Sequence, residues 1–409
     1  MQCLYQKRCL YKRRTALSIF DKCFAYKRVE EAQARGIYPY FTPVEEVYGN
    51  KVKVDGKEMI MVGSNNYLGL LDHPKVMEAA HKAIDQYGVA TCGSRFLNGT
   101  LDIHVEPEEK LAAFMNKEAA LTMSTGFQTN QGVISSLITE NDVVIKDRMD
   151  HASIIDACRL SKGKGVWFKH NDVGHLEQVL SDLDPEVGKL VIVDGVFSME
   201  GDLADLPGIV ELKKKYGFQL LVDDAHGIGV MGDNGRGTAE HFGLEDDVDL
   251  IVGTFSKSFA SLGGFVVGDP KVISYIKHHA RALIFSASIT PASVATVLAT
   301  VEIMEQEPER RHRLWDITRR MKSGFEAMGY DTGPTQTPII PVMIGDDMKT
   351  FMLWRALRDA GIFTNPVIYP AVPHGETLIR TSYSASHTEE ELNTVLQSFE
   401  ECGKKLGII

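Results

Sequence analysis

Two groups with chemical potential follow apolar runs in the middle of the chain. The run QLLVD ends on Asp223, and His226 stands three residues later in DDAHGIG. The run LIVGT is followed by FSKS, which places Lys257 in a short Ser- and Gly-rich turn. A lysine that is partly desolvated and close to other cations has a lowered pKa and can form an imine with a carbonyl. A buried carboxylate such as that of Asp223 can pair with a protonated ring nitrogen.

Two further motifs carry groups that suit a phosphate and an aromatic ring. The segment MSTGFQTNQG, residues 123–132, predicts a strand that turns into a helix at a glycine. The free N–H groups and the dipole at the start of that helix suit a phosphate dianion. The segment KDRMDHAS places His151 at the end of another strand. Its imidazole could stack on an aromatic cofactor there.

The four motifs together predict a site for pyridoxal 5'-phosphate (PLP). Each motif alone is weak, because Asp-x-x-His is typical of a surface turn and Ser-Lys-Ser of a solvated loop. Their order makes the set specific: phosphate cradle, stacking imidazole, carboxylate for a ring nitrogen, and lysine. In PLP chemistry the protonated ring nitrogen lets the ring accept electrons.

A glycine motif offers an alternative from another class of enzyme. Gly227, Gly229 and Gly232 match GxGxxG after a strand, as in a nicotinamide-dependent dehydrogenase. That fingerprint must open a helix, whereas DNGRG at 233–237 predicts a turn. The acidic residue about 20 positions on, Asp249, precedes its strand instead of ending one. A purely structural role is also disfavoured, since it leaves the polar groups at the strand ends unexplained.

The elements that position these residues form a repeating pattern from about Ala119 to Gly268. The clearest expected strands cover 190–194, 219–223, 250–253 and 264–267, and a helix is expected over 206–216. Apolar strands separated by helices are typical of a largely parallel sheet covered on both faces. Ligands of such sheets bind beyond the carboxyl ends of the strands. Those ends carry Asp194, Asp223 and Thr254, so polar chemistry is expected there.

The chain is expected to be an α/β protein in three parts. Residues 1–60 form an N-terminal arm and a short hairpin over 52–61 that turns at Asp55-Gly56. Residues 61–291 form the large domain. A long amphipathic helix over 292–307 then begins a smaller C-terminal α/β domain, residues 292–409.

Composition limits the class of protein. The chain has 409 residues, of which 44% are hydrophobic and 24% charged, as in a soluble globular protein. Its apolar runs fall short of the roughly 20 residues that a membrane-spanning helix needs. The net charge of -11 argues against general binding of nucleic acid. Six cysteines lie far apart, at positions 3, 9, 23, 92, 158 and 402, which favours reduced thiols in the cytoplasm and predicts no metal site.

The first 28 residues differ in charge from the rest of the chain. They hold eight basic residues and one acidic residue, a formal charge of +7. The segment lacks the apolar stretch of a secretory signal. It is either an irregular start of the chain, an arm that contacts anionic lipid at the inner face of a membrane, or an Arg-rich transit peptide.

From about Ile37 onward the chain resembles the α-oxoamine synthase family of fold-type I PLP enzymes. The motifs that carry the resemblance are GSNNYLGL (63–70), GSRFLNGT (93–100), STGFQTN (124–130), DHAS (150–153), DGVFSMEGD (194–202), DDAHGIGVMG (223–232), TFSKS (254–258) and FSASITPA (285–292). Two positions depart from the family pattern: Asp224 stands where Glu is common, and near His104, where the family usually reads His-x-x-Leu-Glu, this chain has Pro107. The resemblance implies an aspartate aminotransferase-like fold and a homodimer with shared active sites.

The resemblance also implies a reaction. Members of the family condense an amino acid with an acyl thioester and release carbon dioxide. His226 favours this condensing branch, because the related transaminases usually carry Tyr at that position. GSRFLNGTLD, FSASITPA and NPVIYPA are most similar to soluble bacterial serine palmitoyltransferases of sphingolipid biosynthesis, which implies L-serine and a long-chain acyl-CoA. A glycine C-acetyltransferase or an 8-amino-7-oxononanoate synthase is the alternative within the family.

By the same resemblance, each motif supplies residues with expected roles. The expected catalytic residues are Lys257, which links PLP covalently, Asp223, which pairs with the ring nitrogen, His151, which stacks on the ring, and His226, which binds the phenolic oxygen together with Ser198. The expected phosphate ligands are Gly126, Phe127, Thr254 and Ser256, with Ser286 and Ser288 from the second subunit. Arg380 and Asn65 are expected to bind the substrate carboxylate.

Overall fold

The computed structural model describes residues 18–409, and the contacts within the chain divide it into two units, Met1–Thr42 and Pro43–Ile409. In its described part the first unit holds two short helices, α1 (Asp21–Phe24) and α2 (Arg28–Ala34), and neither buries a residue. Five of the eight basic residues of the expected arm, up to Arg14, lie outside the described residues. The three interpretations of the arm therefore stay open.

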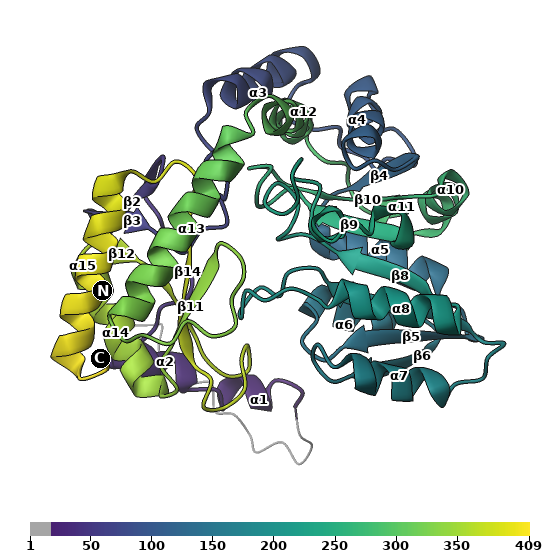
Figure 1. Cartoon of the computed structure of the whole chain (residues 1–409). Helices are drawn as coiled ribbons and strands as arrows, with labels where there is room; N and C mark the ends of the chain where they lie inside the picture. The colour runs from purple at the N-terminus through teal and green to yellow at the C-terminus, as the bar shows by residue number, and fades with distance from the viewer. Residues whose placement is uncertain (1–17) are drawn as a thin grey trace, which may run out of the picture. The chain divides into compact units, whose positions relative to one another are not determined.

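A seven-stranded sheet forms the centre of the second unit (Figure 1). Its strands are β4 (Ala119–Met123), β5 (Asp142–Asp147), β6 (Lys164–Phe168), β7 (Gly188–Asp194), β8 (Gln219–Asp223), β9 (Leu250–Thr254) and β10 (Gly264–Gly268), in the order β4-β10-β9-β8-β7-β5-β6. The pairs from β9 to β6 are parallel, and β10 is antiparallel to both of its neighbours. The expected strands and the largely parallel sheet are confirmed.

Successive side chains of the central strands enter two different cores. On β7, Val191 and Val193 belong to one hydrophobic cluster, and Leu190 and Ile192 belong to another. Side chains along a strand point alternately to opposite faces of the sheet. Both faces are therefore buried, which is why the strand reads as a continuous apolar run and not as an alternating pattern.

Helices cover the two faces of this sheet (Figure 1). The helices of this part of the chain are α3 (Pro74–Tyr87), α4 (Glu106–Phe114), α5 (Gly126–Leu137), α6 (Ala152–Leu160), α7 (Val173–Ser181), α8 (Leu206–Tyr216), α9 (Thr238–His241), α10 (Pro270–His279), α11 (Arg281–Ile284) and α12 (Pro291–Gln306), with 3₁₀ turns at Asp102–His104 and Glu245–Asp247. Local sequence sets their ends. The Asp205 side chain accepts a hydrogen bond from the Gly208 N–H at the start of α8, and Gly217 ends that helix in the left-handed conformation.

The C-terminal part of the chain builds a second core. Its elements are α13 (Glu309–Ala327), β11 (Ile339–Met343), α14 (Asp347–Asp359), β12 (Ile362–Phe363), β13 (Asn365–Val367), β14 (Leu378–Ser382) and α15 (Glu389–Leu406). Strands β11, β14 and β13 form an antiparallel sheet. The expected hairpin consists of β2 (Lys51–Val54) and β3 (Lys57–Met61), which come after β1 (Glu46–Tyr48) in the chain. Strand β12 pairs with this hairpin through β3.

Packing shows which core each boundary element joins. Helix α12 matches the expected helix to within one residue at each end, but residues 294–297 are all buried, so apolar contacts surround it and it is not simply amphipathic. Its Val297 and Val301 pack in a core of the seven-stranded sheet, whereas Ile60 of β3 packs with the C-terminal helices. The domain boundaries expected at residues 60 and 291 stay predictions, and these contacts favour a small domain that includes β3 and excludes α12.

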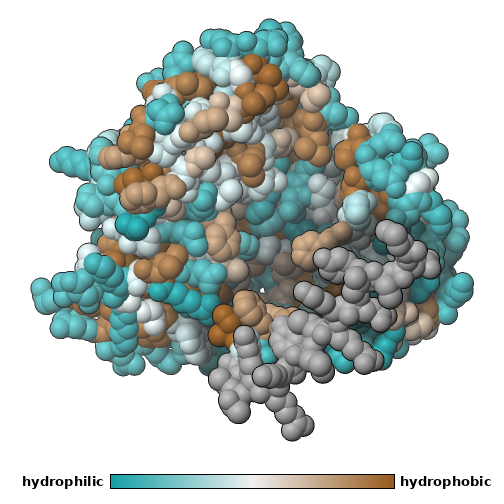
Figure 2. All heavy atoms as spheres, turned by 180° about the vertical axis from the view of Figure 1, so that it is seen from behind, coloured by the Kyte–Doolittle hydropathy of each residue, from teal (hydrophilic) through white to brown (hydrophobic). Residues whose placement is uncertain are grey.

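The surface mixes polar and apolar residues. On the face that Figure 2 shows, hydrophobic residues lie in separate groups between hydrophilic ones. Within residues 18–409, no helix combines the length and the apolar composition that crossing a bilayer requires.

Candidate active site

A cavity of about 270 Å³ lies beyond the carboxyl ends of strands β7, β8 and β9. Nine residues predicted from the sequence line it: Gly126, Phe127, His151, Ser198, Asp223, His226, Thr254, Ser256 and Lys257. They come from five separate segments of the chain. Because the carboxyl ends of parallel strands meet at one edge of a sheet, the fold brings these segments together.

Lys257 is the cation of the cavity, in the turn directly after β9. Burial lowers the pKa of its amine to about 8, although the carboxylates of Asp223 and Asp194 favour the charged form. The positive charge of Arg380 lowers this pKa further. A substantial fraction of the amine is therefore neutral near pH 8, and a neutral amine is the form that attacks carbonyl groups.

A hydrogen-bonded chain links Asp223 to His151. The Asn130 side-chain amide donates to Asp223 Oδ2 at 2.6 Å and to Ser153 Oγ at 2.9 Å. The Ser153 hydroxyl lies 2.8 Å from His151 Nδ1, and the Ser153 backbone N–H donates to that same nitrogen at 3.2 Å. Since Nδ1 accepts, the ring in its neutral form carries its proton on Nε2. Asn130 and Ser153 thus orient both groups expected at the cofactor ring.

A second chain links His226 to Arg380. The buried Tyr67 hydroxyl lies 2.7 Å from His226 Nδ1 and 3.3 Å from Asn65 Oδ1. Arg380 Nη2 donates to the same Asn65 oxygen at 3.0 Å, and Nε donates to the Ser198 carbonyl oxygen at 2.7 Å. Arg380 and Asn65 do not line the cavity, but Arg380 is bonded to Ser198, which does, and Asn65 is bonded to Arg380.

Burial and nearby positive charges keep His226 of this hydrogen-bonded chain neutral. Burial lowers the pKa of His226 well below its usual value, and the positive charges of Lys257 and Arg380 lower it further. Burial also raises the pKa of Tyr67 to about 12, so its phenol keeps its proton near neutral pH. The pair therefore works through hydrogen bonds and carries no net charge.

A cradle for a phosphate lies where α5 begins. The Thr125 side chain accepts from the Gln128 N–H at 3.1 Å, which leaves the first N–H groups of the helix, those of Gly126 and Phe127, for a ligand. The Thr254 and Ser256 hydroxyls lie 2.9 Å apart beside them. A Cβ on Gly126 would stand 2.7 Å from Thr254 Oγ1, so glycine is needed for the close approach. These donors fit a dianion, and the lysine and Asp223 fit the rest of PLP.

The two serines expected from a second subunit lie outside this cavity. Ser286 Oγ accepts from Gln128 Nε2 at 3.0 Å, and Ser288 Oγ donates to the Gly93 carbonyl oxygen at 3.2 Å. Neither is among the residues that line the cavity of its own chain. Their expected role stays a prediction.

A larger cavity, of about 560 Å³, lies at the opposite edge of the sheet. The Nζ groups of Lys117 and Lys189 there donate to backbone carbonyl oxygens. The Asp249 carboxylate binds Lys213 and the Leu220 N–H. These charged groups hold loops together, and the chemistry predicted from the motifs lies in the smaller cavity.

The glycine motif at 227–232 does not begin a helix. Gly229 and Gly232 have φ values of 83° and 80° in a run of turns, and the next helix, α9, starts at Thr238. A Cβ on Gly229 would stand 2.7 Å from Ser258 Cβ. The glycines therefore serve a run of tight turns after His226, and the turn that the sequence predicted at 233–237 stands in place of a dinucleotide-binding helix.

Three residues of the site were missed from the sequence: Asn130, Ser153 and Tyr67. All three lie within motifs that were singled out, STGFQTN, DHAS and GSNNYLGL. Asn130 stands one helical turn after Gly126, so it shares the face of α5 that meets the cavity. That spacing could have identified it, whereas the contact of Tyr67 with His226 joins residues 159 positions apart and has no local pattern.

Comparison with known proteins gives the family. The model of the "Aminotransferase class I and II" family matches residues 57–399. The chain belongs to this family. The serine palmitoyltransferase of Sphingobacterium spiritivorum is 50% identical over 93% of this chain and 95% of its own length. The 8-amino-7-oxononanoate synthase of Thermoanaerobacter pseudethanolicus is 42% identical over 96% of this chain and its full length.

A solved structure supports the same relationship. Serine palmitoyltransferase from S. paucimobilis, with bound PLP and myriocin, is 38% identical and superposes with a TM-score of 0.92 over 97% of this chain and all of its own. The expected family and fold class, an α/β PLP-dependent transferase of fold type I, are confirmed.

The lowered pKa of Lys257 predicts how the cofactor-free protein captures PLP. The rate of capture should rise with pH and level off above about pH 8, because only the neutral amine attacks the aldehyde. Stopped-flow absorbance across pH 6–10 measures it, with Lys257→Ala as the control that forms no covalent product. A rate that keeps rising to pH 10 would mean that the amine has an ordinary pKa.

Proposed function

We propose that this chain is a PLP-dependent acyltransferase that condenses L-serine with a long-chain acyl-CoA, releases carbon dioxide and gives a 3-keto amino product. The observation that carries the proposal is the single cavity in which Lys257, Asp223 and the start of α5 meet, next to the buried Arg380. The half-identical relative named serine palmitoyltransferase supports the choice of serine and of a long acyl chain. This activity would belong to sphingolipid biosynthesis.

The residues that would hold PLP are those of the cavity. Lys257 would bind it covalently, Asp223 would pair with the ring nitrogen, and His151 would cover one face of the ring. Ser198 and His226 would bind the phenolic oxygen. The phosphate ligands would be Gly126, Phe127, Thr254 and Ser256. When bound, PLP supplies an electron sink for negative charge at the α-carbon of the amino acid.

Arg380 would bind the carboxylate of the amino acid. Its Nε and Nη2 are held by the Ser198 carbonyl oxygen and by Asn65, which fixes the plane of the guanidinium. A guanidinium has five N–H donors, so donors remain for a carboxylate. A fixed carboxylate restricts rotation of the amino acid and orients its Cα–H bond for proton removal.

Lys257 is the natural base for that proton. The pKa of its amine, about 8, lies close to neutral pH. General acid–base catalysis is most efficient when the pKa of the catalytic group lies near the pH at which the enzyme works. His151, with its proton on Nε2, can donate to the thioester oxygen as negative charge develops there. The neutral His226 acts as a hydrogen-bonding group.

The alternative within the family is an enzyme with another amino acid or a shorter acyl group, a glycine C-acetyltransferase or an 8-amino-7-oxononanoate synthase. The 42% identity to an 8-amino-7-oxononanoate synthase supports it. The cofactor residues would be the same in both cases, because they act on atoms common to all amino acids. Only the substrates distinguish the two proposals.

We also propose a homodimer that completes each site with Ser286 and Ser288 of the second chain. The Ser94–Ala287 bridge joins the segment that carries these two serines to the GSRFLNGT loop. These joined segments expose Phe96, Leu97 and Phe285, which are 58%, 79% and 72% exposed. Large apolar side chains gathered on joined loops are typical of an interface with another chain.

A cytoplasmic location and a peripheral contact with a membrane are part of the proposal. A long-chain substrate and product partition into lipid, and basic residues next to an anionic surface contribute about 1 kcal/mol each. The basic residues up to Arg28 would supply this attraction. Residues 1–17 lie outside the described part of the chain, so the support is their charge alone.

Replacing Asp223 tests the role of the ring-nitrogen partner. Asp223→Asn should keep the cofactor but lower turnover on the order of 10²–10³-fold, because a neutral amide no longer stabilises the protonated ring. Steady-state rates and cofactor absorbance measure the two effects. Asp233→Asn, an exposed carboxylate of the following loop, is the control. Turnover within a few-fold of the wild type would assign the ring nitrogen to another group.

Substrate preference separates the two functions. Serine, glycine and alanine are offered separately with acetyl-CoA and palmitoyl-CoA, released CoA is measured, and each ketone is identified by mass. Serine with palmitoyl-CoA should give the fastest turnover. Efficient turnover of glycine with acetyl-CoA, and none of serine with palmitoyl-CoA, would move the chain to the acetyltransferase branch and leave the PLP site intact.

Mixing inactive variants tests the shared site. Lys257→Ala chains and chains with both Ser286→Ala and Ser288→Ala should each be inactive, because each lacks one part of every site. In a mixed dimer one of the two sites regains all its parts, so activity should return. Each variant incubated alone is the control. Absent recovery, with chain exchange demonstrated by mass, would show that the two serines do not complete the site of the second chain.

A further inference from the structure

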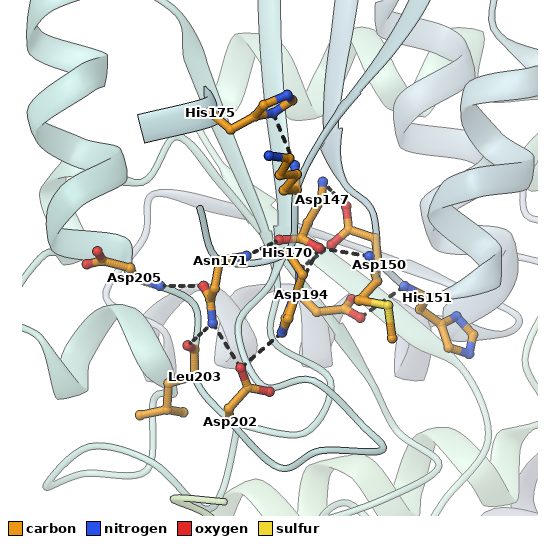
Figure 3. Close-up of polar contacts among 12 residues, drawn as sticks. Asp147, Asp150, His151, His170, Asn171, His175, Asp194, Asp202, Leu203 and Asp205 are labelled. Atoms are coloured by element: carbon orange, nitrogen blue, oxygen red, sulfur yellow. Dashed lines mark hydrogen bonds and ion pairs between the residues drawn. The ribbon is translucent and has the colours of Figure 1, made fainter. Parts of the chain in front are cut away.

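His170 lies between two buried carboxylates, in the loop that follows β6 (Figure 3). Its Nδ1 is 3.1 Å from Asp147 Oδ1, and its Nε2 is 3.1 Å from Asp202 Oδ2. The ring also meets the edge of Phe197, with 4.4 Å between ring centroids. His170 does not line the cavity, and no role predicted from the sequence involves it.

The first carboxylate, Asp147, holds the turn that carries His151. It ends β5 and accepts hydrogen bonds from the Met149 N–H at 2.8 Å and the Asn171 N–H at 2.9 Å. Its own N–H donates to Asp150. The turn is then tied to β7, since the His151 N–H donates to Asp194 Oδ2 at 3.0 Å. Figure 3 shows these residues joined in one network.

The second carboxylate, Asp202, holds the loop that carries Ser198. The Asp202 carbonyl oxygen accepts from the Phe197 N–H at 3.0 Å, and Val196 pairs with Leu203, so residues 196–203 form a closed loop. The Asn171 amide donates to Asp202 Oδ2 at 2.9 Å. The Ser198 carbonyl oxygen in turn accepts from Arg380 Nε. A shift of Asp202 would therefore move the loop that bonds Arg380, the group expected to hold the substrate.

We propose that His170 is a positioning residue that ties the His151 turn to the Ser198 loop and so sets the distance between the ring-covering imidazole and the carboxylate clamp. Its two nitrogens each hold one loop, and its ring packs on the residue before Ser198. This inference rests on the proposed function for the meaning of that distance, but the two loops and their link are features of the chain itself.

Charge makes His170 suited to this role. The hydrogen bonds and negative charges of Asp147 and Asp202 raise the pKa of His170 to about 10 against the opposing effect of burial, so the ring is a cation near neutral pH. A cation with both N–H groups donating to carboxylates forms the stronger class of hydrogen bond. Loss of the ring would leave two buried carboxylates short of a partner, which favours separation of the loops.

Two variants divide the contacts of His170. In His170→Asn the amide nitrogen takes roughly the place of Nδ1 and can reach Asp147, whereas in His170→Gln it takes roughly the place of Nε2 and can reach Asp202. Each variant keeps one of the two contacts and removes the other, while the bonds from Asn171 to Asp147 and Asp202 remain. His175→Asn is the control, because His175 lies in the same region (Figure 3) but bonds to the Lys169 N–H and to neither carboxylate.

Hydrogen exchange of the full chain, with and without PLP, measures the loops independently of activity. His170→Asn should raise exchange in 196–203, and His170→Gln should raise it in 147–151, with the strands of the sheet unchanged. His175→Asn should leave both segments as in the wild type. Exchange that rises evenly over the sheet would show a general structural role for His170. Exchange that rises in neither segment would show that His170 holds neither loop. Either result would overturn the proposal.

Kinetics supply the second readout. With PLP saturating, His170→Asn should raise KM for the amino acid by on the order of 10–100-fold and lower kcat less, because this variant releases the loop that bonds the clamp but does not displace Lys257. A fall in kcat with KM unchanged would overturn the proposal. If the wild type turns over neither serine nor glycine, the proposed function fails, and the exchange measurement still decides whether His170 holds the two loops.

Discussion

The burial of charge at one edge of the sheet is the constraint on which the site depends. Asp194 and Asp223 end adjacent parallel strands, and Lys257 follows the next one. Burial and the charge of Asp223 raise the pKa of Asp194 well above its usual value, while burial lowers that of Lys257. Water would relieve each of these shifts. A covered sheet keeps water out, so the same burial that stabilises the fold prepares an amine that is reactive near pH 8.

Hydrogen bonds from neutral side chains lower the free-energy cost of burying these polar and charged groups together. The Asn130 amide satisfies both Asp223 and Ser153, and Tyr67 satisfies His226 without adding a charge. Each removes a desolvation cost that a buried polar group would otherwise carry. Each also has few alternative partners, so it fixes the orientation of its neighbour. Positioning and stability are therefore supplied by the same hydrogen bonds.

The contact between Arg380 and the Ser198 carbonyl oxygen couples the two cores of the second unit. Strand β14 carries the arginine in the C-terminal sheet, and Ser198 lies on a loop of the seven-stranded sheet. The proposed cofactor residues come from the large sheet, whereas the proposed carboxylate clamp comes from the other core. Binding of an amino acid would thus depend on how firmly the loop around Ser198 is held. His170 does not line the cavity, but it would affect this binding through its contact with that loop.

The sequence by itself determined the strands, the helix starts and nine residues of the cavity, because these depend on local pattern: apolar runs, caps, glycine turns and the rule that parallel strands present their carboxyl ends together. It also pointed to the family through motifs such as STGFQTN and TFSKS. Only the tertiary structure decided that Tyr67 meets His226, that His170 lies between Asp147 and Asp202, and that α12 packs in the core of the large sheet. Those contacts join residues far apart in the chain, and no local periodicity records them, since they are set by how whole elements pack.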